Sequence, residues 1–186
     1  MAIYVLIAGT LILLAGLIWL YNRLVRQWQM VNNGWADIDV QLKRRSDLVP
    51  RLVDVVSAYA AHERNLFEDI AEKRTQARIA GEDPARRAEA ETALAGPVTQ
   101  LLLLAEAYPD LKASENFSDL QNDLVQTENQ IEMARRFYNG AVRELNTTVE
   151  SFPANLVASL LGFSPRNFFE TDSVSRQVPQ VRLTES

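Results

Sequence analysis

Residues 114–152, SENFSDLQNDLVQTENQIEMARRFYNGAVRELNTTVESF, carry the most regular apolar pattern in the chain. Apolar or small side chains recur at alternating steps of three and four, which keeps them on one face of an α-helix. These positions are Phe117, Leu120, Leu124, Thr127, Ile131, Ala134, Tyr138, Ala141, Leu145, Thr148 and Phe152. The spacing predicts a coiled-coil-like helix about 50 Å long, at 1.5 Å per residue. Ser114 is its expected N-cap, and Pro153 should end it.

Small residues alternate with large ones along this stripe. They are Thr127, Ala134, Ala141 and Thr148. Small side chains let two helices approach closely, so this alternation favours packing against another helix of the same chain. The alternative interpretation is that two copies of the chain self-associate through the same stripe.

A second apolar stripe lies upstream, in residues 28–70. Its members are Trp28, Val31, Trp35, Ile38, Leu42, Val49, Leu52, Val56, Tyr59, Leu66 and Ile70. The spacing predicts one face of a long helix, and its phase continues through Pro50. Either the helix is kinked at Pro50, or a second helix begins near Ser46 or Asp47 with Pro50 in its first turn. Three charged residues interrupt the stripe and should either pair across helices or lie solvated at its edge: Arg45, Glu63 and Lys73.

The segment between the two stripes contains helix start and stop signals. Gly81 is expected to stop one helix, and Asp83 and Pro84 to start the next as N-cap and first helical residue. Pro97 should bend this helix, and Pro109 should close it.

The N-terminal residues Ala2 to Tyr21 contain no charged side chain. As a helix they would be about 30 Å long, the thickness of the hydrocarbon core of a bilayer. A cleaved signal peptide or a buried core helix would also be apolar, but the positive n-region of a signal peptide is missing. We therefore expect a retained transmembrane anchor. Its residues are Ile3, Leu6, Leu11, Leu14, Leu17, Trp19 and Tyr21, followed by Arg23 and Arg26.

Positive charges after the span indicate the side of the membrane. The cationic residues nearest the span are Arg23, Arg26, Lys43, Arg44 and Arg45. Positively charged loops stay in the cytoplasm, so the rule places the folded part there.

Three phenylalanines follow a short apolar segment that ends at Gly162. Phe163, Phe168 and Phe169 are candidate contacts for a partner, and the alternative is that they pack under the end of the helical domain. The polar residues from Thr171 to Ser186 predict a flexible C-terminal tail.

Composition excludes several classes of function. The net charge of −5 and the sequence pI near 5.0 offer no cationic surface to nucleic acid. His62 and Glu63 begin an H-E-x-x-H motif, but Leu66 stands where the second zinc ligand would be. The seven glycines never form a phosphate-binding loop, and the chain has no cysteine. A carboxylate site using Glu63, Asp123 and Glu128 remains as a minor alternative. No cofactor, metal or small-molecule substrate is expected.

Several longer stretches resemble the LemA family of membrane-anchored bacterial helical proteins, from about Tyr21 to Glu170. The matching segments are YNRLV (21–25), WADIDVQLKRRSDLVP (35–50), LVDVVSAYAAHE (52–63), AEAYPDLKASENF (105–117), LQNDLVQTENQI (120–131), ARRFYN (134–139) and NTTVESFPANLVA (146–158). The motif residues are Tyr108, Pro109, Leu111, Lys112, Phe117, Arg136, Tyr138 and Asn139. Arg51 departs from the family, where asparagine commonly follows the proline.

The resemblance implies an all-α protein, with an N-terminal transmembrane helix followed by an up-and-down bundle of long antiparallel helices. We expect residues 1–22 to form the anchor, 23–170 a LemA-like helical bundle domain and 171–186 the tail. The function expected is a non-catalytic scaffold or adaptor, a homo-oligomer in the bacterial cytoplasmic membrane. The alternative is a regulatory subunit of a membrane-bound metalloprotease. Some relatives carry a lipoprotein-type start, which leaves the extracytoplasmic side open.

Overall fold

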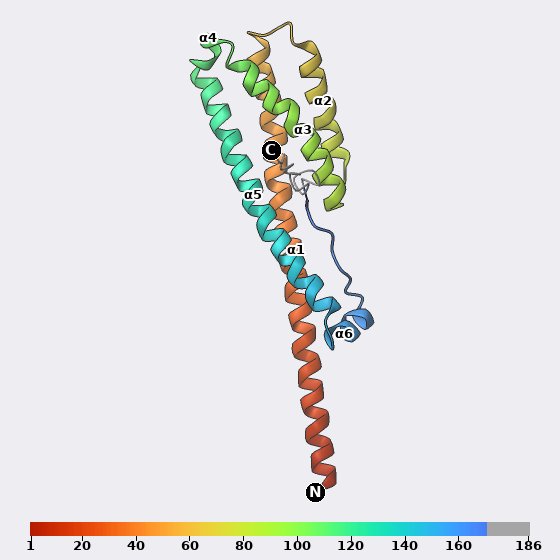
Figure 1. Ribbon diagram of the computed structural model, residues 1–186. Helices are drawn as coiled ribbons and strands as arrows, with labels where there is room; N and C mark the ends of the chain where they lie inside the picture. Colours follow the sequence, from red (N-terminus) through yellow and green to blue (C-terminus); the bar gives the residue numbers. More distant parts are fainter. Residues whose placement is uncertain (171–186) are drawn as a thin grey trace, which may run out of the picture. The chain divides into compact units, whose positions relative to one another are not determined.

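The fold is all-α, as the sequence predicts. The computed structural model describes residues 1–170, which contain helices and no strand. The helices are α1 (Ala2–Ser57), α2 (Arg64–Ile79), α3 (Pro84–Ala105), α4 (Pro109–Lys112), α5 (Glu115–Glu150) and α6 (Ala154–Leu161) (Figure 1). The tail expected over residues 171–186 lies outside the described residues.

The described chain divides into two compact units. The first contains Met1–Leu52 and Glu115–Phe168, and the second contains Val53–Ser114 together with Phe169 and Glu170. A single domain over residues 23–170 therefore stays a prediction from sequence.

In the first unit, α1 and α5 pack antiparallel. Arg45 of α1 reaches Glu128 in the first half of α5, at 3.0 Å from Nη1 to Oε1. The Trp35 ring contacts the Tyr138 ring further along α5 in a tilted arrangement, with ring centroids 5.7 Å apart. Residue numbers rise on α5 as they fall on α1, so the two helices run in opposite directions, as Figure 1 shows.

The stripe predicted on α5 is buried over nearly its full length. The buried members are Phe117, Leu120, Leu124, Thr127, Ile131, Tyr138, Ala141, Leu145 and Thr148. Burial of the small residues within one chain confirms the reading that they pack against another part of the same molecule. Ala134 is half-buried. The prediction is wrong for Phe152, because α5 ends at Glu150 and the Phe152 side chain is 80% exposed.

At Gly34, α1 lies close against α5. A Cβ atom built on Gly34 would lie 3.0 Å from Cδ1 of Phe137 and 3.1 Å from the backbone Cα of Tyr138. Both distances are shorter than ordinary van der Waals contact, so the position accepts glycine best. Close packing of long helices needs such a small residue where the two backbones cross.

The α1 helix continues through Pro50 and ends at Ser57. The sequence leaves open a break near Ser46, which the structure does not have. The break comes later, between Ser57 and Arg64, where Ala60 N–H donates to the Val56 carbonyl at 2.9 Å. Tyr59 lies in this turn and its side chain is 45% exposed, whereas Ile70 belongs to the next helix, α2. The prediction of one uninterrupted helical face as far as Ile70 is therefore wrong. No glycine or proline marks the turn, and its three alanines favour a helix, so local propensity does not account for the break.

In the second unit, α2 packs along α3. Ile70 and Ala77 of α2 are buried, as are Ala88, Leu94 and Leu101 of α3. Both helices thus contribute one apolar face to a common core, as amphipathic helices do.

The start of α3 follows the sequence signals. Gly81 has a φ of 78°, the left-handed region that glycine adopts without strain. A carboxylate oxygen of Asp83 accepts a hydrogen bond from Ala85 N–H at 2.9 Å, and Pro84 is the first helical residue. This cap satisfies an amide that has no partner inside the helix. Pro97 lies within α3, which runs unbroken to Ala105, so the bend expected there stays a prediction.

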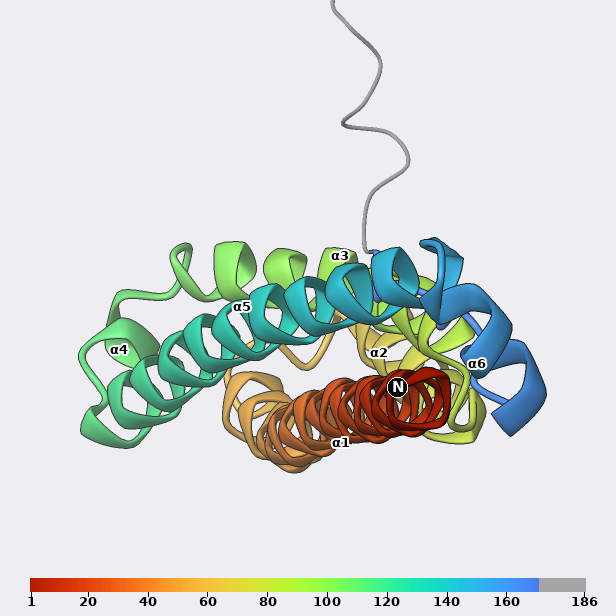
Figure 2. The same ribbon diagram turned by 90° about the horizontal axis from the view of Figure 1, so that it is seen from below.

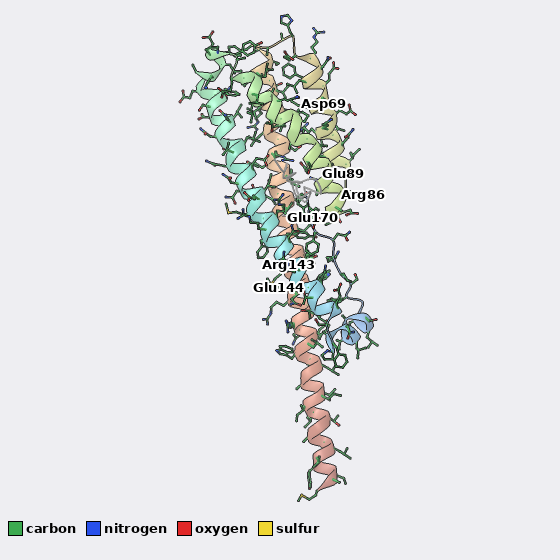
Figure 3. The ribbon with its side chains drawn as sticks, in the orientation of Figure 1. Asp69, Arg86, Glu89, Arg143, Glu144 and Glu170 are labelled. Atoms are coloured by element: carbon green, nitrogen blue, oxygen red, sulfur yellow. The ribbon has the colours of Figure 1, made fainter. Side chains whose placement is uncertain are left out.

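The three charged residues of the upstream stripe have three different environments. Arg45 is buried and pairs across helices with Glu128, which confirms that expectation. Lys73 instead pairs along its own helix with Asp69 (Figure 3), at 2.7 Å from Nζ to Oδ1. That hydrogen bond raises the pKa of the Lys73 amine above its ordinary value, because it favours the charged form. Glu63 is exposed just before α2.

Candidate functional site

The N-terminal part of α1 is an exposed apolar helix. Every residue from Ile3 to Trp19 is exposed, and within the first unit this end of α1 extends beyond α5 and α6 (Figure 1). The anchor residues predicted from sequence are therefore all exposed: Ile3, Leu6, Leu11, Leu14, Leu17, Trp19 and Tyr21. Among the described residues, α1 is the one helix long and apolar enough to cross a membrane by length and composition. A long run of exposed apolar residues of this length is typical of a membrane helix.

Aromatic and cationic residues mark the end of this apolar segment. The guanidinium of Arg23 lies over the ring of Trp19, 5.6 Å from its centroid. Tyr21 meets Phe163 edge to face, with centroids 6.4 Å apart. Aromatic rings and arginines gather at the headgroup level of membranes, and Arg26 is exposed one helical turn further on.

Residues 163–168, which follow α6, contact α1 and α5 within the first unit. Asn146 of α5 makes two hydrogen bonds to the backbone of Arg166: its Oδ1 accepts from the amide at 2.8 Å, and its Nδ2 donates to the carbonyl at 2.9 Å. The hydroxyl of Tyr138 donates to the Asn167 carbonyl at 2.8 Å. The Arg166 guanidinium lies over the ring of Trp28 at 5.8 Å. Residues 163–168 are therefore held on α1 and α5.

An apolar cavity of about 590 Å³ opens between α1, the end of α5 and α6. Its α1 wall includes Leu13, Gly16 and Leu17, which belong to the apolar segment. Its other wall is formed by residues 147–157, including Phe152 and Val157. Arg23 is the charged residue in its lining. The folded part of the first unit thus lies beside the helix that is suited to a membrane.

A smaller groove of about 330 Å³ lies at the middle of the α1 and α5 pair. It is lined by Asp37, Gln41, Gln130, Met133, Ala134 and Phe137. Met133 and Phe137 are exposed at this groove, although both are large and apolar. Its mixture of amides and apolar side chains resembles a protein contact surface more than a small-molecule pocket.

The three phenylalanines predicted as partner contacts have different environments. Phe163 is half-buried against Tyr21, and Phe168 is half-buried. Phe169 is 1% exposed, so its ring is not available at the surface and the alternative of packing within the chain applies to it.

The eight family-motif residues have mainly structural places. Leu111, Phe117 and Tyr138 are buried, and Tyr108 and Pro109 start the short helix α4. Lys112 pairs with Glu106, and Arg136 pairs with Glu132 on the same helix. Asn139 is half-buried on α5.

The structure brings together no catalytic constellation among its described residues. Two of the three carboxylates weighed from the sequence are engaged by arginines: Asp123 by Arg44 at 3.2 Å and Glu128 by Arg45 at 3.0 Å. Glu63 belongs to the second unit. No group of three or more His, Cys, Asp or Glu side chains suited to a metal occurs within residues 1–170.

Sequence reasoning missed Asn146, which holds the segment after α6. Asn146 lies within the NTTVESF stretch that suggested the family, but it sits one residue away from the apolar stripe. Its neighbour Leu145 explains the helix, whereas the partners of Asn146 lie 20 residues downstream in a segment without regular structure. No sequence pattern signals such a contact.

The chain is similar in sequence to several known proteins. The sequence is similar to magnetosome protein MamQ 2 of Paramagnetospirillum magneticum, with 24% identity over 182 residues, which cover 84% of this chain and 67% of the relative. It is also similar to magnetosome protein MamQ of Magnetospirillum gryphiswaldense, with 20% identity over 80% of this chain and 64% of the relative. Protein LemA of Metamycoplasma hominis is 24% identical over 83% of this chain and 71% of the relative.

The family model for the LemA family matches residues 34–183, which include α1 from Gly34 onward, all of α5 and every motif stretch except YNRLV (21–25). The resemblance seen in the sequence is therefore confirmed, and this chain belongs to the LemA family.

Proposed function

We propose that this chain is a non-catalytic, membrane-anchored helical scaffold that self-associates in the bacterial cytoplasmic membrane. The observation that carries the proposal is the continuity of α1, which runs from the exposed apolar segment into the packed unit without a break. A continuous helix couples an anchor to a folded domain more stiffly than a flexible linker does. Copies so anchored would present the same surface at a fixed height above the membrane.

The groove containing Met133 and Phe137 supports the self-association. These exposed apolar residues on α5 face Asp37 and Gln41 of α1 across the groove. Large apolar side chains with a polar rim are typical of protein interfaces. Anchoring in one membrane raises the effective concentration of copies, so even a weak interface would build assemblies. The buried stripe of α5 is used inside the chain, so the outer surface has to provide the contact.

The outer surface of the helices carries solvated charged residues, as expected for a domain that lies outside the membrane. Arg143 and Glu144 on α5, and Arg86 and Glu89 on α3, are exposed charged residues that Figure 3 labels. Such solvated faces keep a helical protein soluble outside the membrane. The chemistry available in the described residues consists of ion pairs and hydrogen bonds.

The test is the mass of the full chain extracted gently from membranes, with co-purifying proteins identified by mass spectrometry. We expect a homogeneous particle that contains several copies of this chain alone. The double variant Met133→Glu, Phe137→Glu should reduce the particle towards a monomer because it places charge in the groove. Ile79→Glu is the matched control, since Ile79 is an exposed apolar residue of α2 and should leave the mass unchanged.

A monomer at every concentration would contradict self-association. A small particle with a stoichiometric membrane protease would instead favour the regulatory-subunit function. Circular dichroism of the double variant has to retain the helical signal, so that loss of assembly is not loss of fold.

A further inference from the structure

The short helix α6 buries its small side chains and exposes its large ones, which is the reverse of an ordinary surface helix. Its alanines, Ala154 and Ala158, are buried, and α6 packs on α5 (Figure 2). Its leucines point outward instead: Leu156 is 63% exposed and Leu160 is 88% exposed. A soluble protein gains most by burying the larger side chains, so this arrangement needs an apolar environment outside the protein.

The exposed apolar surface extends beyond the leucines of α6. Phe152, just before the helix, and Leu161, its last residue, are also exposed. The stretch from Ser151 to Gly162 contains no charged residue. We call Phe152, Leu156, Leu160 and Leu161 the α6 apolar surface. Single exposed leucines are common on proteins, but four large apolar residues within ten positions form a patch.

The position of α6 beside α1 identifies what covers this surface. The cavity between them is lined by Leu13 and Leu17 of α1 on one side, and by Phe152 and Val157 on the other. If Ala2–Tyr21 spans the bilayer, Leu13 lies about 12 Å inside the end of the span, at 1.5 Å per residue over eight residues. Residues across the cavity from Leu13 would then lie at a similar depth. Interfacial helices enter the headgroup and acyl boundary to about 5–10 Å.

The polar groups next to this surface fit the same boundary. Arg23, which lines the cavity, stacks on Trp19, and Tyr21 packs against Phe163 just after α6. Arginine side chains and aromatic rings of this kind lie at the level of the phosphate and glycerol groups of a bilayer. The apolar side chains on α6 therefore match the acyl-chain layer of a phospholipid monolayer, and the cationic groups beside α6 match its headgroup layer.

We propose that α6 and Phe152 form a second membrane contact, inserted into the interfacial layer of the same bilayer that α1 spans. The α6 apolar surface lies among the acyl chains, and acyl chains of phospholipids fill the cavity of about 590 Å³. The proposal rests on the anchor of the proposed function. Its consequence is that the first unit is held against the membrane at two points, so that α5 has a fixed tilt relative to the bilayer.

The absence of cysteine from the sequence allows a direct test in the full chain. Single-cysteine variants Leu160→Cys, Leu11→Cys and Ser118→Cys are labelled with an environment-sensitive fluorophore and reconstituted into vesicles of phosphatidylcholine and phosphatidylglycerol. Quenching is measured with lipids that carry a spin label either near the top or near the end of the acyl chain, so that both shallow and central positions are reported, and with aqueous iodide. Ser118 is the control, because it is exposed near the far end of α5.

We expect the lipid-borne label to quench the fluorophore at Leu160 several-fold more than the one at Ser118, and iodide to do the reverse. Quenching at Leu11 but not at Leu160, with Leu160 open to iodide, would overturn the second contact and leave the anchor intact. Protection of Leu160 from both quenchers would overturn it in favour of a second protein copy on this surface. Absence of lipid quenching at Leu11 would show instead that the anchor itself is wrong.

Discussion

The guanidinium of Arg45 on α1 donates to the carboxylate of Glu128 on α5 at 3.0 Å, but only one end of this pair is buried. The Arg45 side chain is 6% exposed, whereas that of Glu128 is 46% exposed. A buried cation depends on its acceptors, because it has lost most of its hydration. The half-exposed carboxylate of Glu128 loses less of its hydration. This asymmetry makes the pair a test of what holds α1 against α5.

Glu128→Ala should lower the free energy of unfolding by about 1–2 kcal/mol, because it removes an acceptor from a buried guanidinium. The matched control is Asp123→Ala, which breaks a pair with Arg44 whose two ends are about equally exposed. Exposed pairs contribute about 0–1 kcal/mol, so the control should change stability less. Thermal unfolding followed by circular dichroism measures both, and equal effects would contradict the importance of burial.

Gly34→Ala should destabilise the chain, although alanine is the better helix former. The added Cβ would lie 3.1 Å from the backbone Cα of Tyr138, which cannot move without shifting α5. Overpacking of this kind costs about 1–3 kcal/mol. Gly140→Ala on α5 is the control, since a methyl group added there would meet nothing within 4 Å. It should stabilise the helix by roughly 0.5–1 kcal/mol. If both alanines raised the melting temperature, the helices would not touch at Gly34.

Tyr138→Phe should loosen the segment after α6 without unfolding α5. The variant keeps the ring that packs on Trp35 and removes the hydroxyl that donates to the Asn167 carbonyl. Loss of one such hydrogen bond costs about 1 kcal/mol. Amide hydrogen exchange should rise in residues 163–168 and stay unchanged in the middle of α5.

Asn146→Ala should raise exchange in the same segment further, because it removes two hydrogen bonds to Arg166. Tyr59→Phe is the control, since Tyr59 is half-exposed in the turn after α1. Unchanged exchange near Arg166 in the Asn146 variant would mean that other contacts hold the segment.

Gln27→Met should stabilise the chain. Gln27 is buried on α1, and its Oε1 accepts no hydrogen bond within the described residues. A buried polar group left unpaired costs about 1–3 kcal/mol, and methionine has a similar shape without that group. The melting temperature should rise. Gln29→Met, at an exposed position two residues later, should leave it within error. A fall in the Gln27 variant would indicate that the amide is satisfied in the membrane-bound protein.

The local features of this chain could be read from its sequence because each depends on neighbouring residues. The apolar run from Ala2, the cap at Asp83 and the end of α5 ahead of Pro153 follow from hydropathy, side-chain acceptors and the missing proline amide. The stripe of α5 was predicted correctly as far as Thr148 for the same reason, since helical periodicity is a short-range property.

The sequence alone therefore predicts that the protein is all-α, which faces of its long helices are apolar, and that its N-terminal helix suits a membrane. The tertiary structure adds that α1 passes through Pro50 and ends at Ser57, that Arg45 meets Glu128, and that Asn146 holds the chain at Arg166. The tertiary structure also shows that the leucines of α6 point outward. The physical reason is that these features depend on contacts between residues far apart in the chain, whose free energies exceed local preference.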